Sequence, residues 1–152
     1  MNPHDVARQT EVEQEMLRQI MEGLRATAGW QVRGPDAARK LSTLQFIGHS
    51  FQRHLERLLA VEEDGGYMDL VSASAPQLGR AVDALRAEHD QFRTASRRVA
   101  DRLERVSASD PAGLAEVCDE LLALLRKVEA HNRKEIDLLQ EAFAQDEGGE
   151  GG

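Results

Sequence analysis

Cysteine, aromatic residues and long apolar runs are scarce in this sequence, and each scarcity excludes a class of protein. The one cysteine, Cys118, cannot form an internal disulfide, so the chain is not a disulfide-stapled domain. No stretch approaches the roughly 18 apolar residues of a membrane helix, and the N-terminus lacks the apolar run of a signal peptide. We therefore expect a cytoplasmic protein that does not associate with membranes.

Basic residues are outnumbered by acidic ones. The chain has 19 Lys and Arg against 27 Asp and Glu, which gives a formal net charge of −8. Its densest arginine cluster, residues 97–105, is interleaved with Asp101 and Glu104, as on a solvated helix face. A chain of this charge is a poor match for the phosphate backbone of nucleic acids, so we expect no nucleic-acid partner.

Leucine, alanine, glutamate and arginine dominate instead, and together with few prolines they favour helices. The apolar spacing predicts four long helices and a short helical connector at 67–75. The long helices are expected at 5–30, 36–64, 76–106 and 111–144. Short connections between them predict an all-α protein, an antiparallel up-down-up-down four-helix bundle spanning residues 1–145. The acidic, glycine-rich tail 146–152 has nothing apolar to bury and is expected to be disordered.

Polar residues interrupt the apolar stripes of three of these helices. In the fourth helix, His131 and Glu135 occupy consecutive positions of a stripe that is otherwise apolar. In the third helix His89 stands at the centre of the stripe, and in the second His54 lies between Phe51 and Leu58. Polar groups in a core destabilise the fold unless they find partners, and a metal ion would satisfy a carboxylate and histidines together.

Counting residues from the turns places these side chains at similar heights. His89 is about 18 residues before the turn at 107–110 and His131 about 20 after it, so at ~1.5 Å per residue they are nearly level. The same counting brings His54 and Met16 into this layer and puts Glu135 one turn beyond it. We predict that His89 and His131 are buried and face each other.

The pattern of these residues resembles the hemerythrin-like, HHE cation-binding family over roughly residues 10–145. The resemblance implies a four-helix bundle around a non-heme di-iron centre, with His-x-x-x-Glu or Asp on the fourth helix and a histidine on the third. His131-Asn-Arg-Lys-Glu135 is similar to the first motif, and Glu88-His89 to the second.

The first half of the chain departs from that family pattern. Met16 stands where a first-helix histidine is expected. On the second helix the family has His-x-x-x-Glu, and two alignments of this motif compete. In one, His54 is the family histidine and Leu58 replaces the glutamate. In the other, Glu62 is the family glutamate and Leu58 replaces the histidine. His54 and Glu62 are about 12 Å apart along a helix and cannot bind one ion together. Counting along the helices favours His54.

These residues predict a metal site with an incomplete set of ligands, which binds one iron, or zinc, rather than a di-iron pair. The candidate ligands are His54 or Glu62 with His89, His131 and Glu135. A vacant position would accept dioxygen, peroxide or nitric oxide, so we expect gas or oxidant binding rather than enzymatic turnover, with weak oxidase or peroxidase-like chemistry left open. The alternative is a metal-free bundle that acts as a protein-interaction or regulatory module. We expect a monomer or homodimer.

Overall fold

Four long helices and a short connecting helix make up the structure. A computed structural model describes the backbone of residues 3–150 and the side chains of residues 4–144. The elements are α1 (Pro3–Ala28), α2 (Pro35–Glu63), α3 (Tyr67–Ser74), the 3-10 turn η1 (Pro76–Leu78), α4 (Gly79–Arg105) and α5 (Pro111–Glu150). All the predicted helices, including the connector, are present close to their expected bounds.

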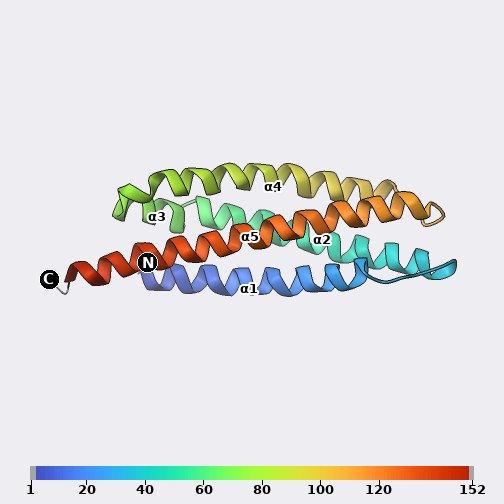
Figure 1. Ribbon diagram of the computed structural model, residues 1–152, viewed down its shortest axis with the longest axis horizontal. Coiled ribbons are helices and arrows are strands. Elements are labelled where there is room, and N and C mark those ends of the chain that lie inside the picture. Colours follow the sequence, from blue (N-terminus) through green and yellow to red (C-terminus); the bar gives the residue numbers. More distant parts are fainter. Residues whose placement is uncertain (1–2, 151–152) are drawn as a thin grey trace.

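The long helices run up, down, up and down along one axis, as predicted. Figure 1 shows both chain ends and α3 at one end of the bundle, with the α1–α2 loop and the α4–α5 turn at the other. Proline begins α2 and α5, where a missing backbone N–H costs nothing. None of the described helices combines the length and apolar character that a bilayer crossing needs.

The connection from α2 to α3 depends on two glycines. Gly65 has a φ of 73°, a left-handed conformation that glycine adopts without strain. A Cβ on Gly66 would lie 2.1 Å from the carbonyl oxygen of Val61, so only glycine fits there. The tight turn brings α3 back across the end of the bundle, where Tyr67 is fully buried.

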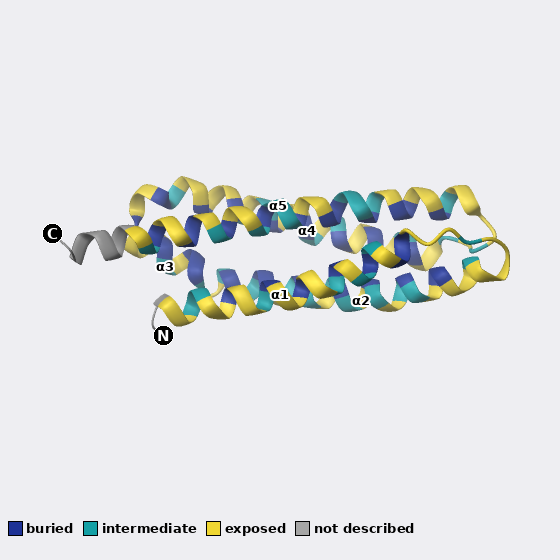
Figure 2. Cartoon of the chain, turned by 60° about the horizontal axis from the view of Figure 1, so that its bottom comes forward, coloured by how far each residue is buried: buried dark blue, intermediate teal, exposed yellow. Residues whose placement is uncertain are grey.

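Two apolar cores fill the bundle. Figure 2 shows buried and exposed residues alternating along the long helices. The main core lies among all four long helices and includes Leu24, Leu44, Leu55, Leu121 and Leu125. The α3-side core lies beneath the short helix and includes Tyr67, Met68, Val71, Leu85 and Leu138. Between these cores lie buried polar residues of α2, α4 and α5 that belong to neither. That polar layer is the candidate site.

The buried face of α1 excludes Met16, which counting along the helices placed in the layer. Met16 is 49% exposed, and Val12, one turn earlier, is 54% exposed. The helix instead buries Gln14, Leu17 and Met21. Both sets have helical spacing, and the true face contains a glutamine at the level of the polar layer, which hides it from a search for apolar positions. Met16 therefore takes no part in the layer.

The predicted disordered tail, 146–152, falls at the end of α5 and beyond it. Helix α5 extends to Glu150, while the side chains of 145–150 and all of residues 151–152 lie outside the described part of the chain. The disorder of the tail stays a prediction.

Candidate metal centre

Four side chains from three helices meet in the polar layer, and we call them the donor cluster: Glu62, His89, His131 and Glu135. Each offers a nitrogen or oxygen atom, and these atoms all lie within 4.8 Å of one another. None of the four residues is more than 1% exposed. Groups of this polarity with so little contact with water must be satisfied by one another, by protons or by a bound cation.

The contacts within the donor cluster are short. Nε2 of His89 lies 3.0 Å from Nε2 of His131. Nε2 of His131 lies 3.1 Å from Oε1 of Glu135, and Nε2 of His89 lies 3.1 Å from Oε2 of Glu62. Donors about 2.1 Å from a shared tetrahedral zinc ion would lie about 3.4 Å from each other, so slight outward movement would accommodate an ion.

Each histidine of the cluster is held through its other ring nitrogen by a carboxylate. Nδ1 of His89 is 2.8 Å from Oε1 of Glu63, and Nδ1 of His131 is 2.5 Å from Oε2 of Glu88. Partial burial would raise the pKa of Glu63, but hydrogen bonds from Arg93 and His89 outweigh it and hold the pKa low. The pKa of Glu88 is lowered in the same way, against partial burial, mainly by Lys134.

Ionised carboxylates only accept hydrogen bonds, so both Nδ1 atoms are donors. In neutral imidazoles both Nε2 atoms then carry lone pairs, and these face each other across 3.0 Å. Two opposed lone pairs need a proton or a cation between them. Metal-binding histidines in proteins are generally oriented by such a carboxylate on the second nitrogen.

Glu62 is the least satisfied member of the donor cluster. Neither of its carboxylate oxygens has a hydrogen-bond partner in the described part of the chain, even though one of them touches His89. Burial, and then the charge of Glu135, raise the pKa of Glu62 well above its usual value. The residue also lies in the last turn of α2, where the helix dipole is negative and no basic side chain opposes it. A proton or a cation would be the partner that this carboxylate lacks.

Glu135, by contrast, has protein donors on both oxygens. The amide Nε2 of Gln14 donates to Oε1 at 3.2 Å, and the phenol of Tyr67 donates to Oε2. Burial would raise the pKa of Glu135, but the hydrogen bond from His131 outweighs it and lowers the pKa. Burial raises the pKa of Tyr67, and the Glu135 charge adds to the effect, so the phenol keeps its proton. Glu135 is thus oriented before any ion binds.

The two histidines differ in their tendency to hold a proton. Burial lowers the pKa of His89, and the hydrogen bond to Glu63 does not compensate. Burial acts the same way on His131, but contacts with Glu135 and Glu88 outweigh it and raise its pKa. The residues present therefore fit a cation: one neutral histidine, one histidine paired with a carboxylate, and an unpartnered carboxylate opposite them.

The structure brings Glu62, His89, His131 and Glu135 together but not His54, so the preference for His54 over Glu62 is wrong. His54 is only half-buried, and its Nδ1 lies 3.0 Å from the carbonyl oxygen of Ser50, one turn earlier. The inward face of α2 runs through Leu55 and Leu58 to Glu62 instead. The predicted pairing of His89 with His131 is confirmed by their facing rings.

Sequence reasoning missed the residues that surround the donor cluster. Gln14 and Tyr67 carry no ligand-like spacing, and Tyr67 reaches the site only through the fold of α3. Glu63 and Glu88 had a signal: each directly adjoins a cluster residue, Glu62 and His89, in the sequence.

Comparison with known families gives a match. The model of the hemerythrin HHE cation-binding domain matches residues 5–143, which is nearly the whole chain and includes the donor cluster. Comparisons with curated proteins and with solved structures each gave no match.

Proposed function

The chain belongs to the hemerythrin HHE cation-binding domain family, and from this premise we propose that it binds one transition-metal ion at the donor cluster. The proposed ion is iron, with zinc as the closest alternative. Two imidazole nitrogens and two carboxylates are donors that suit both metals. We further propose that the site binds or senses dioxygen, peroxide or nitric oxide rather than turning over a substrate.

The observation that carries this proposal is the unpartnered carboxylate of Glu62. A buried carboxylate without a donor costs several kcal/mol in general, and proteins rarely retain one without a reason. The opposed Nε2 atoms of His89 and His131 lie at the same place and need a proton or a cation between them. One cation would satisfy both needs.

A single ion is proposed because the described part of α1 contributes no histidine or carboxylate to the donor cluster. The α1 side chain that reaches the donor cluster is Gln14, whose neutral amide donates a hydrogen bond to Glu135. When bound, an iron ion would supply a redox-capable Lewis acid with room for a small ligand. The protein's own part is to orient Glu135 through Tyr67 and Gln14 and to exclude bulk water.

Elemental analysis of the full chain, purified without added metal, tests the proposal. We expect about one equivalent of iron or zinc per chain in the wild type, because the donor atoms all lie within 4.8 Å of one another and so surround one position. His131→Ala should lose it. His54→Ala is the matched control, because His54 is an imidazole of the same chain outside the donor cluster, and it should keep the metal.

A wild-type chain that carries no metal, and takes up neither Fe²⁺ nor Zn²⁺ when titrated, would refute the proposal. So would equal metal content in His131→Ala and the wild type. Two equivalents of iron with an oxo-bridged absorption spectrum would contradict the single-ion part alone.

The second candidate function is a metal-free interaction module, and the exposed apolar side chains favour it. Phe46 on α2 is 79% exposed, and Val12 and Met16 on α1 are about half exposed. Glu135 is also satisfied without an ion. This candidate predicts that chelator leaves the melting temperature of the purified wild type unchanged, whereas the metal-binding function predicts a fall.

A further inference from the structure

Charged pairs close two sides of the donor cluster. Glu63 and Arg93 are joined at 2.7 Å between α2 and α4, and Glu88 and Lys134 at 2.7 Å between α4 and α5. Each of these carboxylates also holds a ring of the donor cluster. An ion passing on either side would have to break a pair that orients its own ligands.

The two directions along the bundle axis are closed by apolar packing. Toward the chain ends lies the α3-side core, in which Tyr67, Met68 and Val71 are each 0% exposed, and the phenol of Tyr67 contacts Glu135 of the donor cluster. In the opposite direction the main core fills the space among the four long helices. Of the interhelical faces, α1 packs most extensively on α2. The side between α1 and α5 is therefore the remaining direction by which an ion could reach the donor cluster.

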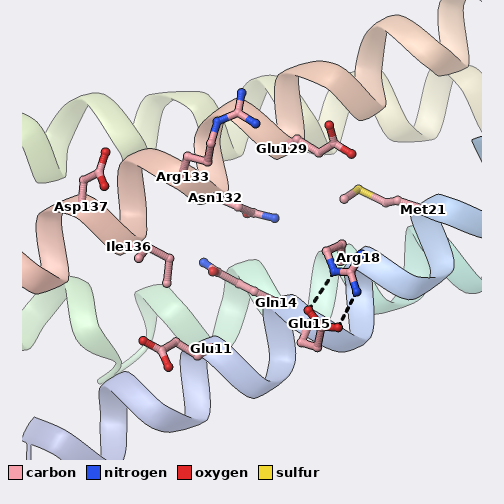
Figure 3. A pocket seen from close by; sticks show the side chains of 10 residues that line it. All are labelled: Glu11, Gln14, Glu15, Arg18, Met21, Glu129, Asn132, Arg133, Ile136 and Asp137. Atoms are coloured by element: carbon pink, nitrogen blue, oxygen red, sulfur yellow. Dashed lines mark hydrogen bonds and ion pairs between the residues drawn. The ribbon is translucent and has the colours of Figure 1, made fainter.

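A groove of about 480 Å³ lies on that side, between α1 and α5 (Figure 3). Gln14 lines this groove, and its amide Nε2 lies 3.2 Å from Oε1 of Glu135. Figure 3 shows the Gln14 side chain pointing from α1 into the space between the helices. One neutral side chain therefore reaches from the groove to the donor cluster.

The charges along the groove favour cations. Two of its carboxylates, Glu11 and Asp137, have no ion-pair partner among the described residues. Of the two arginines that line the groove, Arg18 is paired with Glu15, so Arg133 is the cation left to oppose them. The other two lining carboxylates, Glu15 and Glu129, are each paired with an arginine. An acidic cleft that leads to a buried site raises the local concentration of cations and their rate of entry.

We infer that metal ions reach and leave the donor cluster through the α1–α5 groove, and that Gln14 controls how fast they exchange. The inference rests on the proposed function, because it supplies the route to that same site. The second observation behind it is the unpartnered, fully buried Glu62 at the inner end of the route. Rotation of Gln14 away from Glu135 breaks one hydrogen bond from an uncharged amide, the least costly opening among the sides described.

Rates of Co²⁺ uptake and of Co²⁺ release to excess chelator test the route, with the absorption of the bound ion as the signal. Gln14→Ala and Gln14→Leu both remove the amide, but only alanine removes its bulk. We expect uptake and release to accelerate together, several-fold, in Gln14→Ala relative to Gln14→Leu. Gln91→Ala, in the groove between α4 and α5, is the matched control and should exchange at the wild-type rates.

Removing the charges at the groove tests entry separately. Glu11→Gln with Asp137→Asn should slow uptake several-fold and weaken its dependence on salt. The control, Asp83→Asn with Asp119→Asn, removes the same charge from residues that do not line the groove and should leave uptake unchanged.

Three outcomes would overturn the route. Equal rates in the alanine and leucine variants of Gln14 would show that its bulk is not a barrier. Faster release with unchanged uptake in both variants would show that Gln14 only supports Glu135. Faster exchange in Gln91→Ala would place the route between α4 and α5. A wild type that binds no Co²⁺ at all would instead refute metal binding itself, and the route with it.

Discussion

His89 and His131 face each other across the bundle with their Nε2 atoms 3.0 Å apart, while carboxylates on α2 and α4 hold the opposite ring nitrogens. Neither ring can rotate away without losing a charged hydrogen bond. When both rings are neutral, the two lone pairs are thus kept in an unfavourable position, which a proton on His131 or a bound cation relieves. The surrounding helices supply this constraint before any ligand arrives, which is the preorganisation that selective ion binding requires.

The substitution Glu62→Gln should have opposite effects with and without metal. In chelated protein near neutral pH, it removes a buried, unpartnered carboxylate beside Glu135, so stability should rise by about 1–3 kcal/mol. In metal-loaded protein it removes a charged ligand, so affinity and melting temperature should fall. Thermal melts with and without chelator measure both effects. A variant destabilised in chelator would show that Glu62 is satisfied without an ion.

The carboxylates behind the histidines should matter for affinity. Glu88→Gln leaves the hydrogen bond to His131 uncharged and should weaken metal binding about 10–100-fold, measured by competition with a chromophoric chelator. Glu63→Gln should act similarly through His89. The matched control is Glu104→Gln, whose carboxylate bonds the surface histidine His49 at 2.7 Å. Equal affinities in all three variants would show that these pairs serve stability alone.

The turn before α3 should tolerate no side chain at Gly66. In Gly66→Ala the new Cβ would collide with the backbone carbonyl of Val61, and Tyr67 would lose its position. We expect destabilisation of about 2–4 kcal/mol by urea unfolding. Gly79→Ala is the control, because a Cβ there meets nothing and α4 gains a better helix former, worth about 0.5–1 kcal/mol. Equal free energies of unfolding for Gly66→Ala and the wild type would mean that the turn relaxes without cost to accommodate the new Cβ.

Alkaline pH should destabilise the protein through Cys118. Burial raises the pKa of this thiol above its usual 9.0, although Lys40 partly opposes the shift. A raised folded pKa contributes stability below the unfolded pKa and loses it as pH rises through the folded value. Above pH 9.0 the free energy of unfolding should therefore fall more steeply in the wild type than in Cys118→Ala, by up to about 1.4 kcal/mol per pH unit. Parallel pH profiles would contradict this.

Apolar spacing was sufficient to predict the bundle and the pairing of His89 with His131, because apart from Ser96 and Glu135 the other members of their stripes are apolar. It was insufficient on α2, where His54 and Leu55 are alternative members of one stripe. The helix buries Leu55, Leu58 and Glu62, and a half-buried His54 finds a backbone partner in its own helix. Local spacing cannot choose between faces that differ by one residue when each carries a plausible ligand.

The sequence was least informative where the site depends on neutral polar residues or on a turn. Gln14 is a buried polar residue on a face whose competitor, through Val12 and Met16, is more apolar. Tyr67 reaches Glu135 because Gly65 and Gly66 turn the chain back over the bundle end. Neither the contact of Gln14 with Glu135 nor that of Tyr67 with Glu135 can be recognised from the spacing of residues in the sequence.

The polar layer between the two apolar cores has a consequence for how the molecule unfolds. Because apolar packing is interrupted there, α3 and the helix ends beside it can open as a cooperative unit while the main core stays intact. An ion held by α2, α4 and α5 would couple the α3 unit to the main core, so that the two unfold together. Native-state hydrogen exchange should accordingly show two protection classes in chelated protein and a single class once metal is bound.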